Sequence, residues 1–259
     1  MDVDEFKKNL RIAMNMGWIH EIDNIVNEAR REGFDLMNLR YSLGAGEDND
    51  FSVLMLAIIA NERSNVIQCL LDNGADVTYG TKDGFTPLHL LACGDVAVVD
   101  ISYALDTARE FIERGADVDA IEDSKTPIFY ALRNPEMVRL LIKAGCDVHY
   151  RLGYTRNMTL LMYAAQAGHP ESVHLLIKAG VDIDLKDKRG WTAVDWARFA
   201  ENVGATKVLE EAIRHRDSHL MFALGNHERI GSESLIRLLD LGVIDEILDK
   251  LREPHPVGV

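Results

Sequence analysis

The hydrophobic positions of this chain fall in short runs with helical spacing, and polar turns separate the runs at nearly constant intervals. Between residues 51 and 200, one run in each unit follows a hydroxyl residue, a type that often caps the start of a helix. The hydroxyl residues are Ser52, Thr86, Thr126, Thr159 and Thr192, at successive spacings of 34, 40, 33 and 33 residues. Four units close with a glycine-x-aspartate sequence, which starts at Gly74, Gly115, Gly145 and Gly180. Self-similarity at this period predicts a stack of repeated units in which each unit contacts its neighbours.

Residues 81–115 show how one such unit is built. Gly84 lies in a turn sequence, and Thr86 is placed to cap a helix whose first residue is Pro87. Proline is harmless there, because the first N–H of a helix has no partner within the helix. A second helix ends before Gly115, since glycine readily adopts the left-handed conformation that follows a helix. The unit is therefore predicted to hold two antiparallel helices and a projecting hairpin.

The sequence Thr86-Pro87-Leu88-His89, together with Gly-Ala-Asp-Val at 115–118, resembles the ankyrin repeat. The resemblance covers residues 49–216 and includes five copies at the family's spacing. It implies an all-α fold, an ankyrin-repeat solenoid of helix-turn-helix units with projecting β-hairpins. It also implies that His89 is structural and stabilises the stack.

Two units depart from the regular length. The second has extra residues between Asp95 and Asp106, which must lengthen either the loop between its helices or its second helix. The third hairpin is long, because Thr159 lies 14 positions after Gly145. Insertions in repeats often lie on the binding face, and neutral variation of a loop is the alternative.

The ends of the chain differ from the repeats. A stack needs atypical units that cover its two exposed apolar faces. We expect residues 1–48 to form an N-terminal helical cap, a degenerate repeat, and residues 217–259 to form a C-terminal helical extension or cap. The first helix of the N-terminal cap carries a predicted apolar stripe of Phe6, Leu10, Ile12, Ala13 and Met16.

The segment Leu235–Leu251 resembles an F-box-like helix of the PRANC type, found at the C-termini of some viral ankyrin proteins. Its leucine-rich core carries the resemblance, whereas Leu239-Asp240 stands where the F-box has Leu-Pro. The resemblance implies contact with the Skp adaptor of a cullin ligase. One alternative function is therefore a substrate adaptor for ubiquitin ligation, and the other interpretation of this segment is a cap on the fifth repeat.

The charge balance narrows the class of partners. The chain has 28 Lys and Arg against 42 Asp and Glu, a formal net charge of −14 at pH 7. This balance argues against general binding to nucleic acid or to an anionic membrane. The acidic start Asp2-Val3-Asp4-Glu5 is unlike a targeting signal. The longest apolar run, residues 51–60, is too short to span a membrane. The three cysteines show no pattern of disulfide pairing, which suits a reducing compartment. We expect a cytoplasmic or nucleocytoplasmic protein that is not secreted.

We find no sequence motif for catalysis or cofactor binding, such as a phosphate-binding loop or a dinucleotide fingerprint. Glu211, His215 and His219 have the spacing of metal ligands on one helix face, but surface polar residues commonly share that spacing. We therefore predict a non-enzymatic protein with no catalytic residue, cofactor or metal. An enzyme built on an ankyrin scaffold is the alternative.

The resemblance implies binding through the hairpin tips and the first helices, which line the concave face of an ankyrin array. The residue before each cap hydroxyl lies on this path. These residues are Phe51, Phe85, Lys125, Met158 and Trp191. Exposed aromatic residues in such a column would be binding hot spots, and the alternative is that they pack against adjacent hairpins.

The hairpin tips in the C-terminal half are locally basic and aromatic, although the whole protein is acidic. We therefore predict a protein-protein interaction module whose protein or peptide partner has an acidic and apolar segment. The residues predicted to contact it, besides the column above, are Tyr154, Arg156, Gln166, Arg189 and Arg198.

Overall fold

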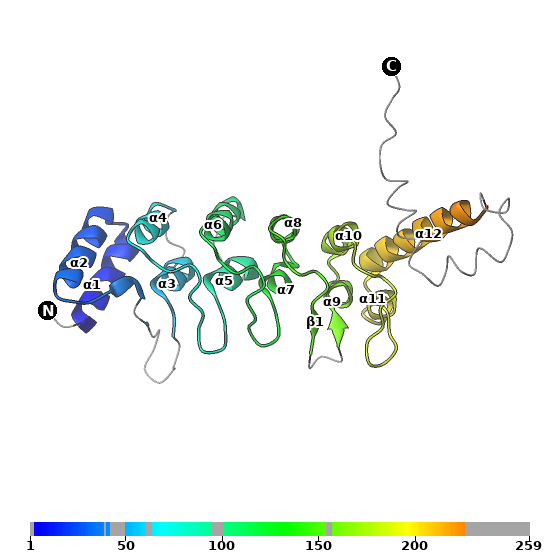
Figure 1. Ribbon diagram of the computed structural model, residues 1–259, viewed down its shortest axis with the longest axis horizontal. Helices are drawn as coiled ribbons and strands as arrows, with labels where there is room; N and C mark the ends of the chain where they lie inside the picture. The colour runs from blue at the N-terminus through cyan, green and yellow to red at the C-terminus, as the bar shows by residue number, and fades with distance from the viewer. Residues whose placement is uncertain are drawn as a thin grey trace, which may run out of the picture. The chain divides into compact units, whose positions relative to one another are not determined.

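The computed structural model describes residues 3–38, 40–41, 50–60, 64–94, 101–153 and 157–225 (Figure 1). Within these residues the regular secondary structure is almost entirely helical, and the chain divides into two units, Met1–Leu209 and Glu210–Val259. The N-terminal cap contains α1 (Val3–Met16), α2 (Ile19–Arg31) and the short 3₁₀ helix η1 (Leu36–Asn38). The first helices of the following pairs are α3 (Val53–Ile59), α5 (Pro87–Cys93), α7 (Pro127–Ala131), α9 (Leu160–Ala167) and α11 (Ala193–Phe199). The helices that follow them are α4 (Ser64–Asp72), α6 (Ile101–Glu113), α8 (Pro135–Lys143), α10 (Pro170–Lys178) and α12 (Val203–Gly225).

The helices of the first unit lie in two rows (Figure 1). In one row α5 packs against α3 and α7, and α9 packs against α11. In the other row α8 packs between α6 and α10. This arrangement confirms the predicted all-α stack of helix pairs in which each pair contacts its neighbours.

The first helices are buried on most of their surface. In α3 every residue from Val53 to Ile58 is buried. The second helices bury one face only, as α8 does through Met137, Val138 and Leu141. The continuous apolar runs of the sequence thus become the central row, and the amphipathic runs become the outer row.

Hydroxyl residues cap the first helices as predicted. In four of the described pairs the hydroxyl oxygen accepts the backbone N–H three residues on, and the side chain of that third residue accepts the N–H of the cap residue in return. The reciprocal pairs are Ser52 with Met55, Thr86 with His89, Thr159 with Met162, and Thr192 with Asp195. Thr126 precedes α7 without a side-chain cap hydrogen bond, and Phe129, the third residue there, has no side-chain acceptor for the return bond.

The second unit and the third hairpin, which depart from the regular length, differ from the other units in structure. In the second unit α6 has 13 residues, whereas α4, α8 and α10 each have 9, so the second helix takes up part of the extra length. The third hairpin contains the one two-stranded sheet of the described residues, with β1 (Arg151–Leu152) antiparallel to β2 (Met158–Thr159). Arg151 is paired with Thr159, and Leu152 with Met158.

The N-terminal cap corrects one detail of the sequence prediction. Helix α1 packs against α2 through Phe6, Leu10 and Ala13, which are buried. Ile12 and Met16, which the sequence pattern places in the same apolar stripe, are exposed, because they lie outside the arc of the helix that holds Phe6, Leu10 and Ala13. The predicted F-box-like segment Leu235–Leu251 lies outside the described residues.

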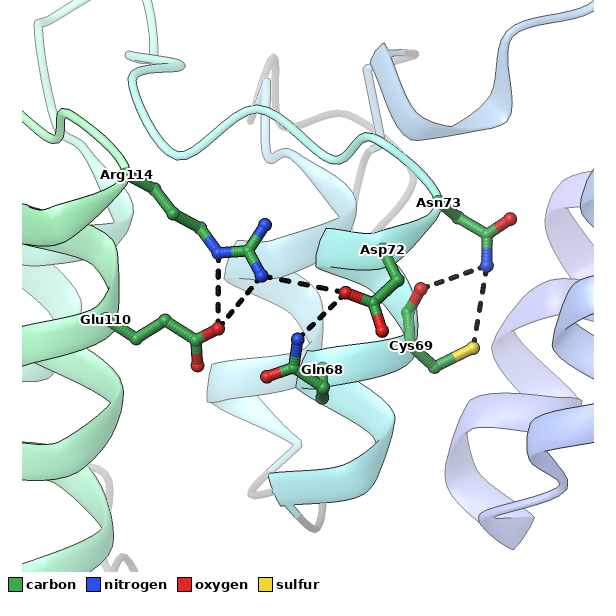
Figure 2. A network of polar contacts seen from close by, with 6 residues as sticks. All are labelled: Gln68, Cys69, Asp72, Asn73, Glu110 and Arg114. Atoms are coloured by element: carbon green, nitrogen blue, oxygen red, sulfur yellow. Dashed lines mark hydrogen bonds and ion pairs between the residues drawn. The ribbon is translucent and has the colours of Figure 1, made fainter.

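Polar contacts join α4 to its neighbours, and Figure 2 shows those that link it to α6 and those of Asn73 with Cys69. The side-chain amide of Asn73 donates to Oδ1 of Asp23 in α2 at 2.7 Å and to the backbone oxygen of Cys69 in α4 at 2.9 Å. Arg114, which follows α6, lies 3.0 Å from Glu110 and 3.6 Å from Asp72 of α4.

Burial and the neighbouring Asp23 raise the pKa of the Cys69 thiol to about 12. Cys69 is therefore a protonated packing residue and not a reactive thiolate.

Candidate protein-binding surface

The turn that leads into α11 is built around one buried carboxylate. Asp187 accepts the backbone N–H groups of Arg189 at 2.8 Å and Trp191 at 2.9 Å. Its second oxygen accepts Nε1–H of Trp196 at 3.2 Å. Three donors on one buried carboxylate fix the turn, and the turn sets the position of Trp191 relative to α11.

Three aromatic rings form a cluster at α11, the first helix of the last pair. The ring of Trp191 lies 5.0 Å from that of Trp196 and 5.2 Å from that of Phe199, and the latter two are 6.0 Å apart. Trp196 is buried and Trp191 is half-buried, whereas Phe199 is 64% exposed. A buried ring thus supports two rings that present apolar surface to solvent, as in a binding hot spot.

Basic side chains lie next to this cluster. The guanidinium of Arg189 lies over the Trp191 ring at 5.7 Å, in a cation–π contact. Arg198 and Lys188 are exposed nearby in the sequence. The pKa of Asp195 is held below its ordinary value, mainly because its carboxylate accepts the backbone N–H of Thr192. That carboxylate is therefore committed to the helix cap.

The residues that precede the cap hydroxyls pack against neighbouring rings and also keep part of their surface exposed. Phe85 stacks on His89 at 5.2 Å and meets the edge of Tyr130 in the next repeat at 5.9 Å. Nζ of Lys125 lies 5.5 Å from the centre of the Tyr130 ring. Phe51, Phe85, Lys125 and Trp191 are half-buried and keep part of their surface open.

Met158 differs from the other members of that column, because it lies in β2 and is only 5% exposed. Gln166 is half-buried on α9, whose neighbour is α11, and Arg189 and Arg198 are exposed. Tyr154 and Arg156 lie outside the described residues.

Sequence reasoning missed three aromatic residues of this side of the repeats. Phe199 completes the Trp191 cluster, and Tyr130 receives both Phe85 and Lys125. Tyr163 of α9 contacts Phe129 at 5.9 Å. The only signal in the sequence was the three-residue spacing of Trp196 and Phe199, which places both on one side of a helix.

Across the described ranges, no group of three or more His, Cys, Asp or Glu side chains is arranged to hold a metal ion. No helix within the described part of the chain is long and apolar enough to cross a bilayer.

The stacked helix pairs, the hydroxyl-capped first helices and the projecting hairpins define a repeat protein of the class that binds other proteins. The family model described as ankyrin repeats (3 copies) matches residues 54–152, 97–187 and 149–218, which together span more than half of the chain. The chain belongs to the ankyrin-repeat family, and the resemblance of the Thr86-Pro87-Leu88-His89 unit is confirmed. Its repeats make it a protein-protein interaction module. No curated protein sequence matches the chain.

Proposed function

We propose that this protein is a non-enzymatic interaction module that binds a protein or peptide through the concave side of its repeats. The centre of the proposed surface is the cluster of Trp191 and Phe199, with Arg189, Arg198 and Gln166 around it. The observation that carries the proposal is the exposed Phe199 ring on a cluster that Asp187 holds in place. The proposed partner segment is acidic and apolar.

The chemistry of the surface supports this partner. Aromatic rings that are already ordered lose little conformational entropy on binding and supply most of the affinity. The neighbouring cations would set the orientation of an acidic segment and raise its association rate. Phe51, Phe85 and Lys125 extend the proposed surface along the stack, and the sequence adds Tyr154 and Arg156 of the third hairpin. Met158, which the sequence also placed in this column, is buried and does not take part.

Other parts of the proposal depend on the sequence alone. They are the division into a cap (1–48), five repeats (49–216) and a C-terminal extension (217–259), and the intracellular setting in cytoplasm or nucleus. The adaptor function through Leu235–Leu251 is a prediction of the same kind. Deleting residues 226–259 tests it, since an adaptor would keep its target but lose Skp–cullin association.

Affinity purification followed by quantitative mass spectrometry tests the surface. Wild type is compared with Phe199→Ser and Arg189→Glu, and with the control Ile121→Ser, which removes another exposed hydrophobic side chain. We expect both surface variants to lose at least one partner that wild type and the control retain. Equal recovery of every partner by all four proteins would overturn the proposed surface.

A further inference from the structure

The residue that follows α4 is Asn73, and together with Gly74 it forms the one Asn-Gly pair in the sequence. The backbone nitrogen of the next residue can attack the side-chain amide of an asparagine, and a glycine there has no Cβ to obstruct the attack. Gly74 is exposed and has φ +85°, and a Cβ added to it would meet nothing closer than 3.9 Å. The pair therefore combines a reactive sequence with an accessible turn.

The turn itself does not require asparagine at this position. The residues that end the second helices of the third and fourth pairs, before Gly145 and Gly180, are Ala144 and Ala179. Alanine therefore forms the same helix end in two other repeats, and the side chain of Asn73 has a different purpose.

That purpose is a contact with the N-terminal cap. Nδ2 of Asn73 donates to Oδ1 of Asp23 in α2 at 2.7 Å and to the backbone oxygen of Cys69 at 2.9 Å, and Figure 2 shows the second of these bonds. The guanidinium of Arg30, also in α2, donates to the backbone oxygen of Asn73. Asn73 thus connects the cap to the first repeat through its side chain and its backbone.

We propose that Asn73 is a site of spontaneous deamidation, and that this modification weakens the contact between the N-terminal cap and the first repeat. The nitrogen of Gly74 forms a bond to Cγ of Asn73, the Cγ–Nδ2 bond breaks, and the amide group leaves as ammonia with the proton of the Gly74 N–H. Water then adds to one of the two carbonyl carbons of the succinimide ring and opens it. Residue 73 becomes aspartate or isoaspartate, and the reaction needs no oxidant or reductant.

The contacts of Asn73 control how fast this reaction runs. The Gly74 N–H donates to the backbone oxygen of Leu71 at 3.0 Å, and Asp23 and Cys69 hold the amide. The attack therefore requires the end of α4 to open and the amide to leave Asp23. The rate at residue 73 reports how often this contact opens.

The product cannot restore the contact when the turn closes again. The amide of Asn73 donates to two oxygens, whereas a carboxylate has no proton to donate and carries the same charge as Asp23. Isoaspartate also adds a carbon atom to the backbone of the turn. Each modified molecule therefore keeps a weaker junction between α2 and α4.

The first experiment follows deamidation in the full-length protein, at neutral pH in water enriched in heavy oxygen, which enters the product when the ring opens. Peptide mass spectrometry compares Asn73 with two internal controls, Asn24 and Asn27, which are exposed on α2 and precede Ile25 and Glu28. We expect residue 73 to take up the label first. Uptake at Asn24 or Asn27 that is as fast as at residue 73 would overturn the proposal.

Variants of α2 test whether the cap controls the rate. Asp23→Ala should accelerate deamidation of Asn73 by about five-fold, the change expected when one hydrogen bond that opposes the opening is lost. Asp23→Asn keeps an acceptor oxygen and should stay close to wild type. The control Glu21→Ala removes an exposed carboxylate of the same helix and should also behave as wild type. Equal rates in Asp23→Ala and Glu21→Ala would show that the contact does not control the reaction.

Amide hydrogen exchange of α2 tests the consequence. Asn73→Ala has no amide to lose, and alanine is already present at the equivalent positions, so this variant should exchange equally fast before and after incubation. In wild type we expect exchange in α2 to rise by about five-fold or more in the deamidated molecules. Unchanged exchange in incubated wild type, or an equal rise in incubated Asn73→Ala, would overturn the proposed weakening of the cap.

Discussion

The imidazole Nδ1 of His89 lies 2.8 Å from the hydroxyl oxygen of Thr86, and both side chains are buried. Nδ1 also accepts the backbone N–H of Thr86 at 3.1 Å, while the N–H of His89 donates to the Thr86 hydroxyl at 3.4 Å. The reciprocal cap requires an unprotonated Nδ1, because only the neutral ring has an acceptor there.

The first prediction concerns acid stability. Burial lowers the pKa of His89 from 6.5 to about 4. The unfolded chain therefore takes up a proton at this residue as the pH falls through 6.5, whereas the folded chain resists until about 4. The contribution of neutral His89 to the free energy of unfolding is therefore complete above pH 6.5. It is lost as the pH falls from 6.5 to 4, by on the order of 3 kcal/mol at most.

The control for this prediction is His89→Met, since methionine occupies the same position in two other repeats, as Met55 and Met162. We expect the midpoint of urea unfolding to depend less on pH for the variant than for wild type between pH 7 and 4. Parallel pH profiles for the two proteins would show that His89 does not titrate in this way.

The second prediction concerns the sulfur that replaces imidazole in the first repeat. The backbone N–H of Ser52 points at Sδ of Met55 at 3.4 Å, and both residues are buried. Met55→Leu keeps the volume but leaves this N–H without an acceptor, so we expect a loss of about 1 kcal/mol in the free energy of unfolding. The matched change Met14→Leu, at a buried methionine of α1 with no cap to support, should be closer to neutral. Equal effects of the two substitutions would mean that the sulfur contributes packing only.

These caps explain how far the sequence could predict the fold. Hydroxyl caps, first-position prolines and left-handed glycines act over a few residues, so Thr86, Pro87 and Gly115 report their local structure directly. The repeat then follows from their spacing, because each unit packs against one like itself.

The parts that could not be predicted depend on packing between distant elements. The ring contacts of Tyr130 with Phe85 and of Phe199 with Trp191 arise only when the repeats and turns are assembled. The exposure of Ile12 was accessible in principle, since a helical turn of about 100° per residue places it about 200° from Leu10. Residue type alone does not show this difference, because both side chains are apolar.

The third prediction concerns the turn that holds Trp191. Asp187→Asn replaces two acceptor oxygens by one and leaves at least one of the donors on Asp187 unsatisfied. We expect a loss of about 1–3 kcal/mol and a change in tryptophan fluorescence, because Trp196 loses its partner or Trp191 its anchor. Asp182→Asn is the control, since that exposed carboxylate accepts the N–H of Asp184 in an ordinary turn. If both variants unfold at the wild-type urea concentration, Asp187 does not organise the cluster.

The last prediction compares two glycines with the same backbone conformation and different surroundings. Gly84 has φ +86° and Gly115 has φ +95°, so alanine is strained at either position. At Gly84 an added Cβ would also lie 2.1 Å from the backbone oxygen of Ile121 in the next hairpin, whereas at Gly115 nothing lies within 4 Å. We expect Gly115→Ala to cost about 1 kcal/mol and Gly84→Ala about 3 kcal/mol or more, because a backbone oxygen cannot move aside without separating the two hairpins. Urea unfolding of both variants measures the difference, and comparable losses would show that these hairpins do not touch in solution.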